Sequence, residues 1–209
     1  LLLLTTISLS AQWRIKFDGA DTDNEVKSVS FISPSTGYIA TQKWIGFTTD
    51  SGQTVQKRFV TLSNVNWNNN PVNLTFGFSV EDIHAFSADT LVISGDYGLE
   101  PSILYSTNDG ANWLLVFHRQ IPFNTVNIFN SMWQMEFPGL GSIGFAVHGD
   151  QVLKTSNRGQ SWQVVRQDNN QELFDITFPT QQTGFAAGPN RLLKTSNGGS
   201  SWCILEVSF

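Results

Sequence analysis

Three carboxylates, Asp96, Glu100 and Asp150, have the residue type and position needed for acid–base chemistry. Each lies between two short apolar runs, so each is expected in a loop that joins two strands. Two carboxylates that face each other across a cleft are the groups that hydrolyse glycosidic bonds. An acidic residue in a glycine-containing turn more often stabilises the turn itself. These carboxylates therefore indicate a catalytic alternative, and we assign no residue a catalytic role.

Other side chains that serve as metal ligands or nucleophiles are sparse in this sequence. His84, His118 and His148 lack the short spacing of metal-binding histidines. We expect His84 to pack in or beside a strand, and His148, which precedes Gly149, to be a solvated loop residue. Cys203 is the single cysteine, which excludes an intrachain disulfide, and it is expected in a strand. The sequence predicts no metal site and no cofactor.

One turn of related sequence occurs four times, as TTDSGQTV (48–55), STNDGANW (106–113), TSNRGQSW (155–162) and TSNGGSSW (195–202). The Asp or Asn at its third position can accept hydrogen bonds from the following backbone N–H groups. The glycine at its fifth position permits a positive φ. The tryptophan at its eighth position, Val55 in the first copy, is expected to begin a strand and bury its ring. These structural positions are Asp50, Asn108, Asn157 and Asn197, then Gly52, Gly110, Gly159 and Gly199, then Trp113, Trp162 and Trp202.

A second repeat precedes each turn and predicts the elements that carry it. Its copies, at 28–41, 82–95, 135–149 and 175–188, each contain an apolar strand, a polar turn and another apolar strand. A third strand, the repeated turn and a fourth strand follow. Units of four short strands at such periods are typical of β-propeller blades, and no amphipathic helical pattern competes. We predict an all-β fold in which 12–209 form a propeller with blades at about 25–60, 79–118, 131–167 and 172–208.

The repeated turns resemble the Asp-box, also called the bacterial neuraminidase repeat. The whole pattern is most similar to the exported β-propellers that resemble the photosystem II stability/assembly factor. The resemblance implies that each box joins the third and fourth strands at the blade periphery, away from the ligand-binding centre. Asn replaces Asp in three boxes, yet its oxygen can still accept from the backbone. The resemblance is specific for fold, and implies an exported non-catalytic scaffold for binding or assembly.

The competing interpretation is a glycan-active enzyme, resembling a sialidase or a xyloglucanase, with some catalytic residues outside this sequence. Sialidase-like proteins need three arginines around the substrate carboxylate. Their early Arg-Ile-Pro motif has a partial counterpart in WRIKF (13–17), where Lys16 replaces Pro. No set of three arginines emerges, since Arg158 lies in a box and Arg58 and Arg166 lie in or beside expected fourth strands.

The ends of the sequence suggest processing and a larger ring. The segment 1–11 resembles the remnant of a secretory signal peptide, with a buried N-terminal strand as the alternative. We therefore expect an exported protein, either secreted, periplasmic or at the cell surface. Blade four has its own fourth strand, so QWRIKF (12–17) has no blade to close. We expect a fragment of a monomeric ring of six to eight blades, the alternative being a complete ring of four or five.

The expected partner is a protein or a glycan. The net charge of −5 and the pI near 5.0 argue against nucleic acid, and no apolar run reaches the length of a membrane span. Loops between second and third strands and loops between blades should share one face. Trp67 lies in the longest insertion, 61–77, and either contacts a partner or packs on its own blade. The binding candidates are Lys43, Trp44, Trp67, Asp96, Tyr97, Glu100, His148, Asp150, Asn190 and Arg191. Alanine at Trp67, Tyr97 or His148 is expected to leave folding intact.

Overall fold

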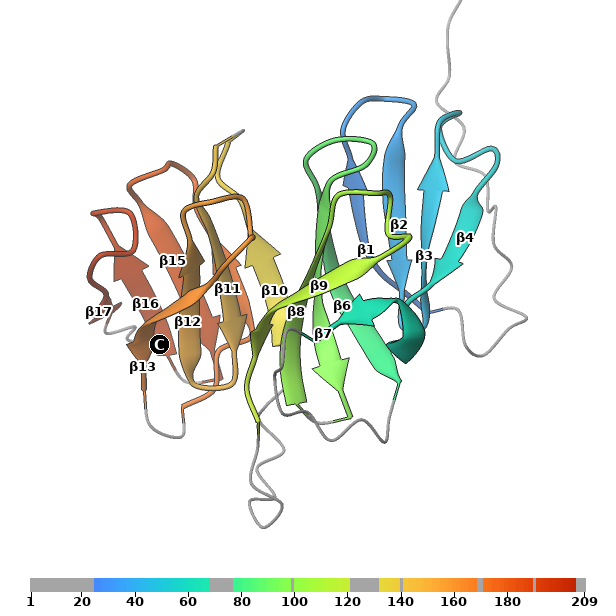
Figure 1. The fold of residues 1–209 in the computed structure, drawn as a ribbon. Helices are drawn as coiled ribbons and strands as arrows, with labels where there is room; N and C mark the ends of the chain where they lie inside the picture. The colour runs from blue at the N-terminus through green and yellow to red at the C-terminus, as the bar shows by residue number, and fades with distance from the viewer. Residues whose placement is uncertain are drawn as a thin grey trace, which may run out of the picture.

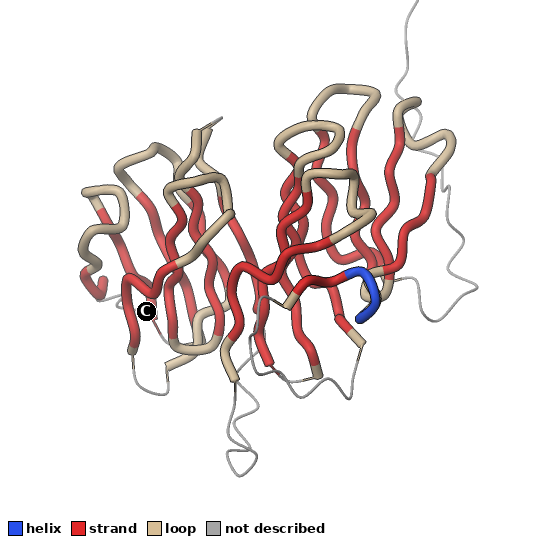
Figure 2. The backbone as a smooth tube through the Cα atoms, in the orientation of Figure 1, coloured by secondary structure: helices blue, strands red, loops and turns tan. Residues whose placement is uncertain are grey.

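The computed structural model describes residues 25–67, 77–98, 100–120, 132–139, 141–168, 171–189 and 191–205. These residues form four β-sheets that lie side by side in chain order (Figure 1). Within each sheet, strands that follow one another in the chain pair antiparallel, except that β5 of sheet two pairs parallel with β9. The helical segment among them is η1 at Leu62–Asn64, a single 3-10 turn that is blue in Figure 2. The all-β prediction is therefore confirmed.

The strand bounds are as follows. Sheet one contains β1 (Val26–Phe31), β2 (Gly37–Thr41), β3 (Trp44–Thr48) and β4 (Gln56–Phe59). Sheet two contains β5 (Val65–Asn66), β6 (Phe78–Ala85), β7 (Leu91–Tyr97), β8 (Glu100–Ser106) and β9 (Trp113–His118). Sheet three contains β10 (Met132–Glu136), β11 (Gly144–His148), β12 (Gln151–Thr155) and β13 (Gln163–Gln167). Sheet four contains β14 (Asp175–Thr177), β15 (Gly184–Gly188), β16 (Arg191–Thr195) and β17 (Cys203–Leu205).

The connection from sheet one to sheet two supplies a fifth strand that the repeat did not predict. Strand β5 pairs parallel with β9, with Val65 opposite Trp113 and Asn66 opposite Leu114. The Val65 side chain is buried against the core of sheet two. This short strand therefore covers the outer edge of sheet two. The outer strands β4, β13 and β17 carry no such additional strand within the part of the chain that the structure describes.

Apolar side chains fill the spaces between neighbouring sheets. One cluster joins Tyr38 and Ile45 of sheet one to Leu91 and Trp113 of sheet two. Further clusters occupy the other two spaces, around Val92 and Trp162 between sheets two and three, and around Phe145 and Phe178 between sheets three and four. The alternation of apolar residues along the inner strands places one face of each strand toward each neighbour. The hydrophobic core therefore consists of three separate apolar layers, one between each pair of neighbouring sheets.

The repeated turns all join the third strand of a sheet to the fourth, and their hydrogen bonds follow one pattern. The hydroxyl at the first position donates to the side-chain oxygen at the third position, at 2.9–3.0 Å, and accepts from the glycine N–H at the fifth. The third-position oxygen also accepts from the backbone N–H at the seventh position. These internal bonds satisfy the backbone groups that leave the strand ladder.

The exchange of Asp for Asn has a direct explanation in these turns. In the first turn, Asp50 accepts a hydrogen bond from the Thr54 hydroxyl through its second oxygen, at 2.7 Å. In the third and fourth turns, the amide of Asn157 or Asn197 donates to the hydroxyl of Ser161 or Ser201 at 2.9 Å. A hydroxyl can both donate and accept, so either side chain completes the same network.

Both the fourth and the fifth residue of each turn have positive φ. The glycines have φ of 70–81°, as expected from the sequence. The preceding residues, Ser51, Asp109, Arg158 and Gly198, have φ of 57–62°, which the variable fourth position did not predict. The backbone N–H of each fourth residue donates to a carbonyl in the turn between the first two strands, at 2.8–2.9 Å. The repeated turn therefore ties together both turns at one end of its sheet.

Candidate functional site

The turns between second and third strands lie at the edge opposite the repeated turns, the lower edge in Figure 1, and the described residues that follow sheets two and three lie beside them. Backbone hydrogen bonds join the two kinds of connection. Arg119 N donates to Pro101 O at 3.0 Å, and Asp168 N donates to Asp150 O at 2.8 Å. We call this edge the loop face. It is the face on which the sequence placed the binding candidates.

Glu100, Ser102 and His118 form the first polar group of the loop face. The His118 Nδ1 lies 2.9 Å from Ser102 Oγ, and its Nε2 lies 3.4 Å from Glu100 Oε2. Burial lowers the pKa of His118, while the nearby Glu100 carboxylate raises it in part. The residue types are those of a Ser–His–Glu catalytic triad. Ser102 is fully buried, however, and a nucleophile must reach its substrate. This group is structural.

Arg119, Asp150 and His148 form the second group. Arg119 follows β9 of sheet two, and its Nη1 donates to Asp150 Oδ1 of sheet three at 3.1 Å. His148 is fully buried at the end of β11, with its Nε2 2.9 Å from Gln151 Oε1. Burial, followed by the charge of Arg119, lowers the pKa of His148 to about 4. The expectation of a solvated loop histidine was therefore wrong, because the strand continues through this residue.

Asp168, Arg166 and Arg191 form the third group, which crosses from sheet three to sheet four. Asp168 accepts hydrogen bonds from Arg166 and, at 2.5 Å, from Nη2 of Arg191. Arg191 also donates to Gln171 Oε1 at 3.0 Å. Partial burial opposes ionisation of Asp168, but the hydrogen bonds and charges of the two arginines outweigh it and lower the pKa. The second and third groups thus hold adjacent sheets together at the loop face.

Several candidates from the sequence lie within strands or pack on their own sheet. Trp44, Asp96 and Tyr97 are within strands and are 3–7% exposed, which corrects their placement in loops. Trp67 is half-buried, and its ring lies 4.6 Å from that of Tyr97, so it packs on its own sheet. Because alanine at Tyr97 or His148 would empty a buried site, the structure predicts that these substitutions destabilise the fold, in contrast to the expectation from the sequence. Asn190, like the segment 1–11, lies outside the described residues.

The remaining candidates stay accessible in part. Lys43 is exposed on the loop face, while Glu100, Asp150 and Arg191 are half-buried in the ion pairs described above. Glu100 and Arg191 were expected in loops but are the first residues of β8 and β16. The three carboxylates considered for hydrolysis thus differ: Asp96 is buried, and each of the others faces a basic side chain of the protein. The described residues contain no group of three His, Cys, Asp or Glu side chains that could hold a metal ion.

The binding candidates from the sequence did not include Arg119, Asp168 or Phe174. Arg119 and Asp168 each follow a fourth strand by one residue, so a comparison of the segments after the fourth strands could have identified them. Phe174 lies in the connection from sheet three to sheet four and is 40% exposed. No helix among the described residues has the length and apolar character to cross a lipid bilayer.

No protein-family model and no curated protein matches this chain in sequence. Solved structures do resemble it. YCF48 from Cyanidioschyzon merolae has a TM-score of 0.59 at 14% identity, over 90% of this chain and 58% of that one. A GH74 enzyme from Niastella koreensis has a TM-score of 0.58 at 16% identity, over 86% and 30%. The GH74 xyloglucanase from Xanthomonas campestris has a TM-score of 0.54 at 14% identity, over 87% and 30%.

These likenesses establish the fold and leave the activity open. This chain spans little more than half the length of YCF48 and under a third of each GH74 enzyme. Proteins with one fold host unrelated functions, so the function must be argued from the site. The four sheets are the sheets of a partial β-propeller.

Proposed function

We propose that this protein is a non-catalytic β-propeller that binds a protein partner through its loop face. The observation that carries this proposal is the set of cross-sheet ion pairs, Arg119 with Asp150 and Arg191 with Asp168. Each pair neutralises a carboxylate and fixes two sheets relative to one another. A face that is already rigid loses little conformational entropy on binding, which favours recognition.

The buried aromatic side chains favour a protein over a glycan as the partner. Trp44 and Tyr97, two aromatic binding candidates from the sequence that could have stacked on a sugar ring, are buried. The exposed side chains of Lys43 and Phe174 supply a charge and an apolar contact, a combination common at protein interfaces. A glycan partner remains the second proposal within the same binding role.

We further propose that the repeated turns are Asp-boxes and that the protein belongs with the exported propellers resembling the photosystem II stability/assembly factor. The likeness to YCF48 and the repeated hydrogen-bond pattern support this assignment. It carries with it two proposals from the sequence, namely export from the cytoplasm and a ring with more sheets than the four described.

A glycan-active enzyme is the second candidate, favoured by the likeness to GH74 enzymes. Glu100 and Asp150 are its remaining carboxylates, yet both are engaged by His118 and Arg119. We expect no release of reducing ends from xyloglucan by the purified protein. If the wild-type protein released reducing ends and both Glu100→Gln and Asp150→Asn abolished that release, the scaffold proposal would be overturned.

The binding role is tested with a displayed library of random peptides. Peptides enriched on the wild-type protein are synthesised, and their affinities are measured for Lys43→Glu, Phe174→Ala and the control Lys57→Glu. We expect the two loop-face variants to lose about tenfold in affinity, as is usual for central contacts. Lys57 is exposed within β4, opposite Gly46 and outside the connections of the loop face, so its variant should bind normally. Affinities that do not distinguish the control would contradict the loop face as the site.

A further inference from the structure

At the outer edge of sheet three lies a strand whose outer side is unpaired and which has exposed apolar side chains. Strand β13 pairs with β12 on one side, and no strand among the described residues pairs with its other side. Val164 is 45% exposed and Val165 is 36% exposed. An edge strand presents unpaired N–H and C=O groups that can accept another strand. Strand β13 has no lysine or proline, and its one charged residue, Arg166, donates to Asp168 and to the Trp202 carbonyl. The valines on this edge therefore favour strand addition.

Sheet two shows that such an edge accepts a strand in this fold. Leu114 of β9 follows the tryptophan of its turn, and Asn66 of β5 pairs opposite it in parallel. Gln163 of β13 likewise directly follows Trp162, the tryptophan of the third turn. The two outer strands thus have the same position in their sheets. The site that β5 fills on sheet two has an open counterpart on sheet three.

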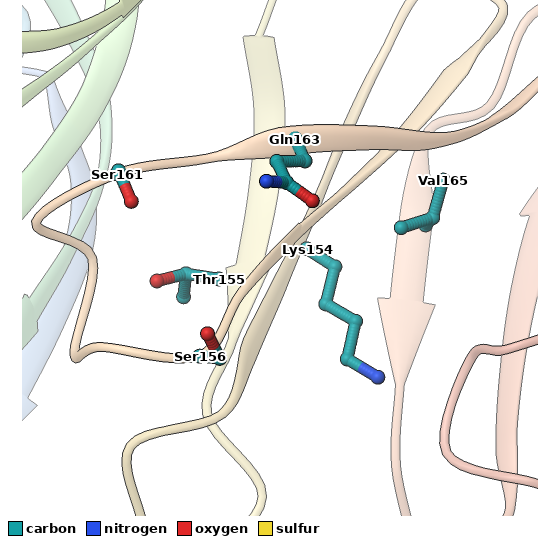
Figure 3. A pocket seen from close by; sticks show the side chains of 6 residues that line it. All are labelled: Lys154, Thr155, Ser156, Ser161, Gln163 and Val165. Atoms are coloured by element: carbon teal, nitrogen blue, oxygen red, sulfur yellow. The ribbon is translucent and has the colours of Figure 1, made fainter.

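A cavity of about 260 Å³ lies beside this open position. It is lined by Lys154, Thr155, Ser156, Ser161, Gln163 and Val165 (Figure 3). Figure 3 shows Gln163 and Lys154 on neighbouring strands, with the third turn closing one side. Hydroxyl, amide and ammonium groups dominate the lining, and no carboxylate contributes to it. These groups can donate hydrogen bonds to an anionic side chain.

Lys154 supplies the charge of this cavity. Its Nζ donates to the Gly198 carbonyl at 2.6 Å and lies 5.4 Å from the centre of the Phe145 ring. Within the described ranges, no carboxylate forms an ion pair with it. An ammonium group has three donors, so the carbonyl leaves two for another acceptor. A carboxylate is the acceptor that binds such a group most strongly.

We propose that the outer edge of β13 binds an extended segment of a partner protein by parallel strand addition, with an acidic side chain entering the cavity beside Lys154. Residues opposite one another on paired strands project to the same face of the sheet. Because Gln163 lines the cavity, the partner residue opposite Gln163 projects toward it. That residue corresponds to Asn66 in the pairing of β5 with β9. The site is separate from the loop face and does not depend on it.

The experiment uses a peptide whose sequence follows that of β5 and its neighbours. The capped peptide Ser-Asn-Val-Glu-Trp-Asn copies residues 63–68 with Glu in place of Asn66, and the unchanged Ser-Asn-Val-Asn-Trp-Asn is its control. Both are titrated into the ¹⁵N-labelled protein, and amide shifts and hydrogen exchange are followed. We expect the Glu peptide to bind about tenfold more tightly, the usual effect of a hydrogen bond between charged groups. Exchange should slow at amides within Gln163–Gln167.

Matched variants separate the cavity from the rest of the protein. Lys154→Met keeps the aliphatic stem and should abolish the preference for the Glu peptide. Lys194→Met makes the same change at the equivalent position of sheet four and should retain it. Thermal melts check folding, and Lys154→Gln replaces Lys154→Met if the latter unfolds. No binding at millimolar peptide, a Glu preference that survives without Lys154, or shifts confined to the loop face would each overturn the proposal.

Discussion

At the scale of single residues, the repeated turn works because two consecutive residues adopt positive φ. This pair aims the fourth-position N–H at the neighbouring turn and brings the fifth-position glycine against the preceding sheet. A Cβ on Gly110, Gly159 or Gly199 would lie 2.4–2.6 Å from a side chain of the preceding sheet. A Cβ on Gly52 would have no atom within 4 Å. The glycine therefore has two roles, one in backbone conformation and one in packing between sheets.

The first prediction separates these two roles. Gly52→Ala should lower the free energy of unfolding by about 1 kcal/mol, because only the positive φ is unfavourable. Gly199→Ala should lower it by about 2–4 kcal/mol, since the new Cβ also overlaps the Phe145 ring. Urea unfolding of both variants measures the difference. Equal losses would contradict the packing role.

At the scale of elements, Asp82 joins three inner strands. From β6 it accepts a hydrogen bond from Ser28 Oγ of β1 at 2.6 Å and another from Met135 N of β10 at 2.7 Å. A third bond comes from the adjacent Ile83 N at 2.8 Å. Burial raises the pKa of Asp82, while these three donors lower it in part. One side chain thus holds sheets one, two and three in register at their inner edges.

The second prediction concerns this connection. Asp82→Ala should lower the free energy of unfolding by about 2–4 kcal/mol, because it leaves the Met135 N–H without its acceptor. Asp82→Asn should lower the free energy of unfolding by less, since its side chain retains one oxygen that can accept a hydrogen bond. A double-mutant cycle with Ser28→Ala should give a coupling of about 1 kcal/mol between the two side chains. A coupling free energy near zero would show that the Ser28 hydroxyl does not stabilise the contact between β1 and β6.

At the scale of the whole molecule, the four sheets form a linear array in which packing joins neighbours. Stability in such an array depends on each sheet and on each interface. Two histidines contribute to packing between sheets two and three. The half-buried His84 of sheet two stacks on Phe137 of sheet three, and the buried His148 of sheet three lies near Phe117 of sheet two. Burial lowers the pKa of each to about 4.

The third prediction follows from the sign of these shifts. Between about pH 6.5 and pH 4 the unfolded chain binds protons at His84 and His148 that the folded chain does not. Stability is therefore complete above pH 6.5 and falls as the pH approaches 4, by up to about 3 kcal/mol for His148. The raised pKa values of Glu81, Asp82 and Glu136 act in the opposite direction. The comparison with His148→Gln isolates the histidine, and identical pH curves would contradict its role.

Much of the fold could be predicted because its signals are local. A hydroxyl, an Asp or Asn and a glycine at fixed spacing form the same turn wherever they occur, since their hydrogen bonds remain within eight residues. The alternating apolar residues likewise specify strands without reference to distant parts of the chain. The candidate site was harder to predict. Lys43 is exposed as expected, whereas Trp44, Tyr97 and His148 are buried.

The sequence by itself determined the all-β class, the four-stranded repeat and the conformation of the turn glycines, because each depends on interactions between residues close in the chain. Only the tertiary structure decided which polar residues are paired. Arg119 pairs with Asp150 and Arg191 pairs with Asp168 because neighbouring sheets pack side by side. The pairing of β5 with β9 likewise depends on how the chain passes from sheet one to sheet two. Such contacts join residues of different repeats, and the sequence does not show which partner each residue has. They form because packing between sheets partly buries charged side chains at the edge, and a partly buried charge is stable when it is paired.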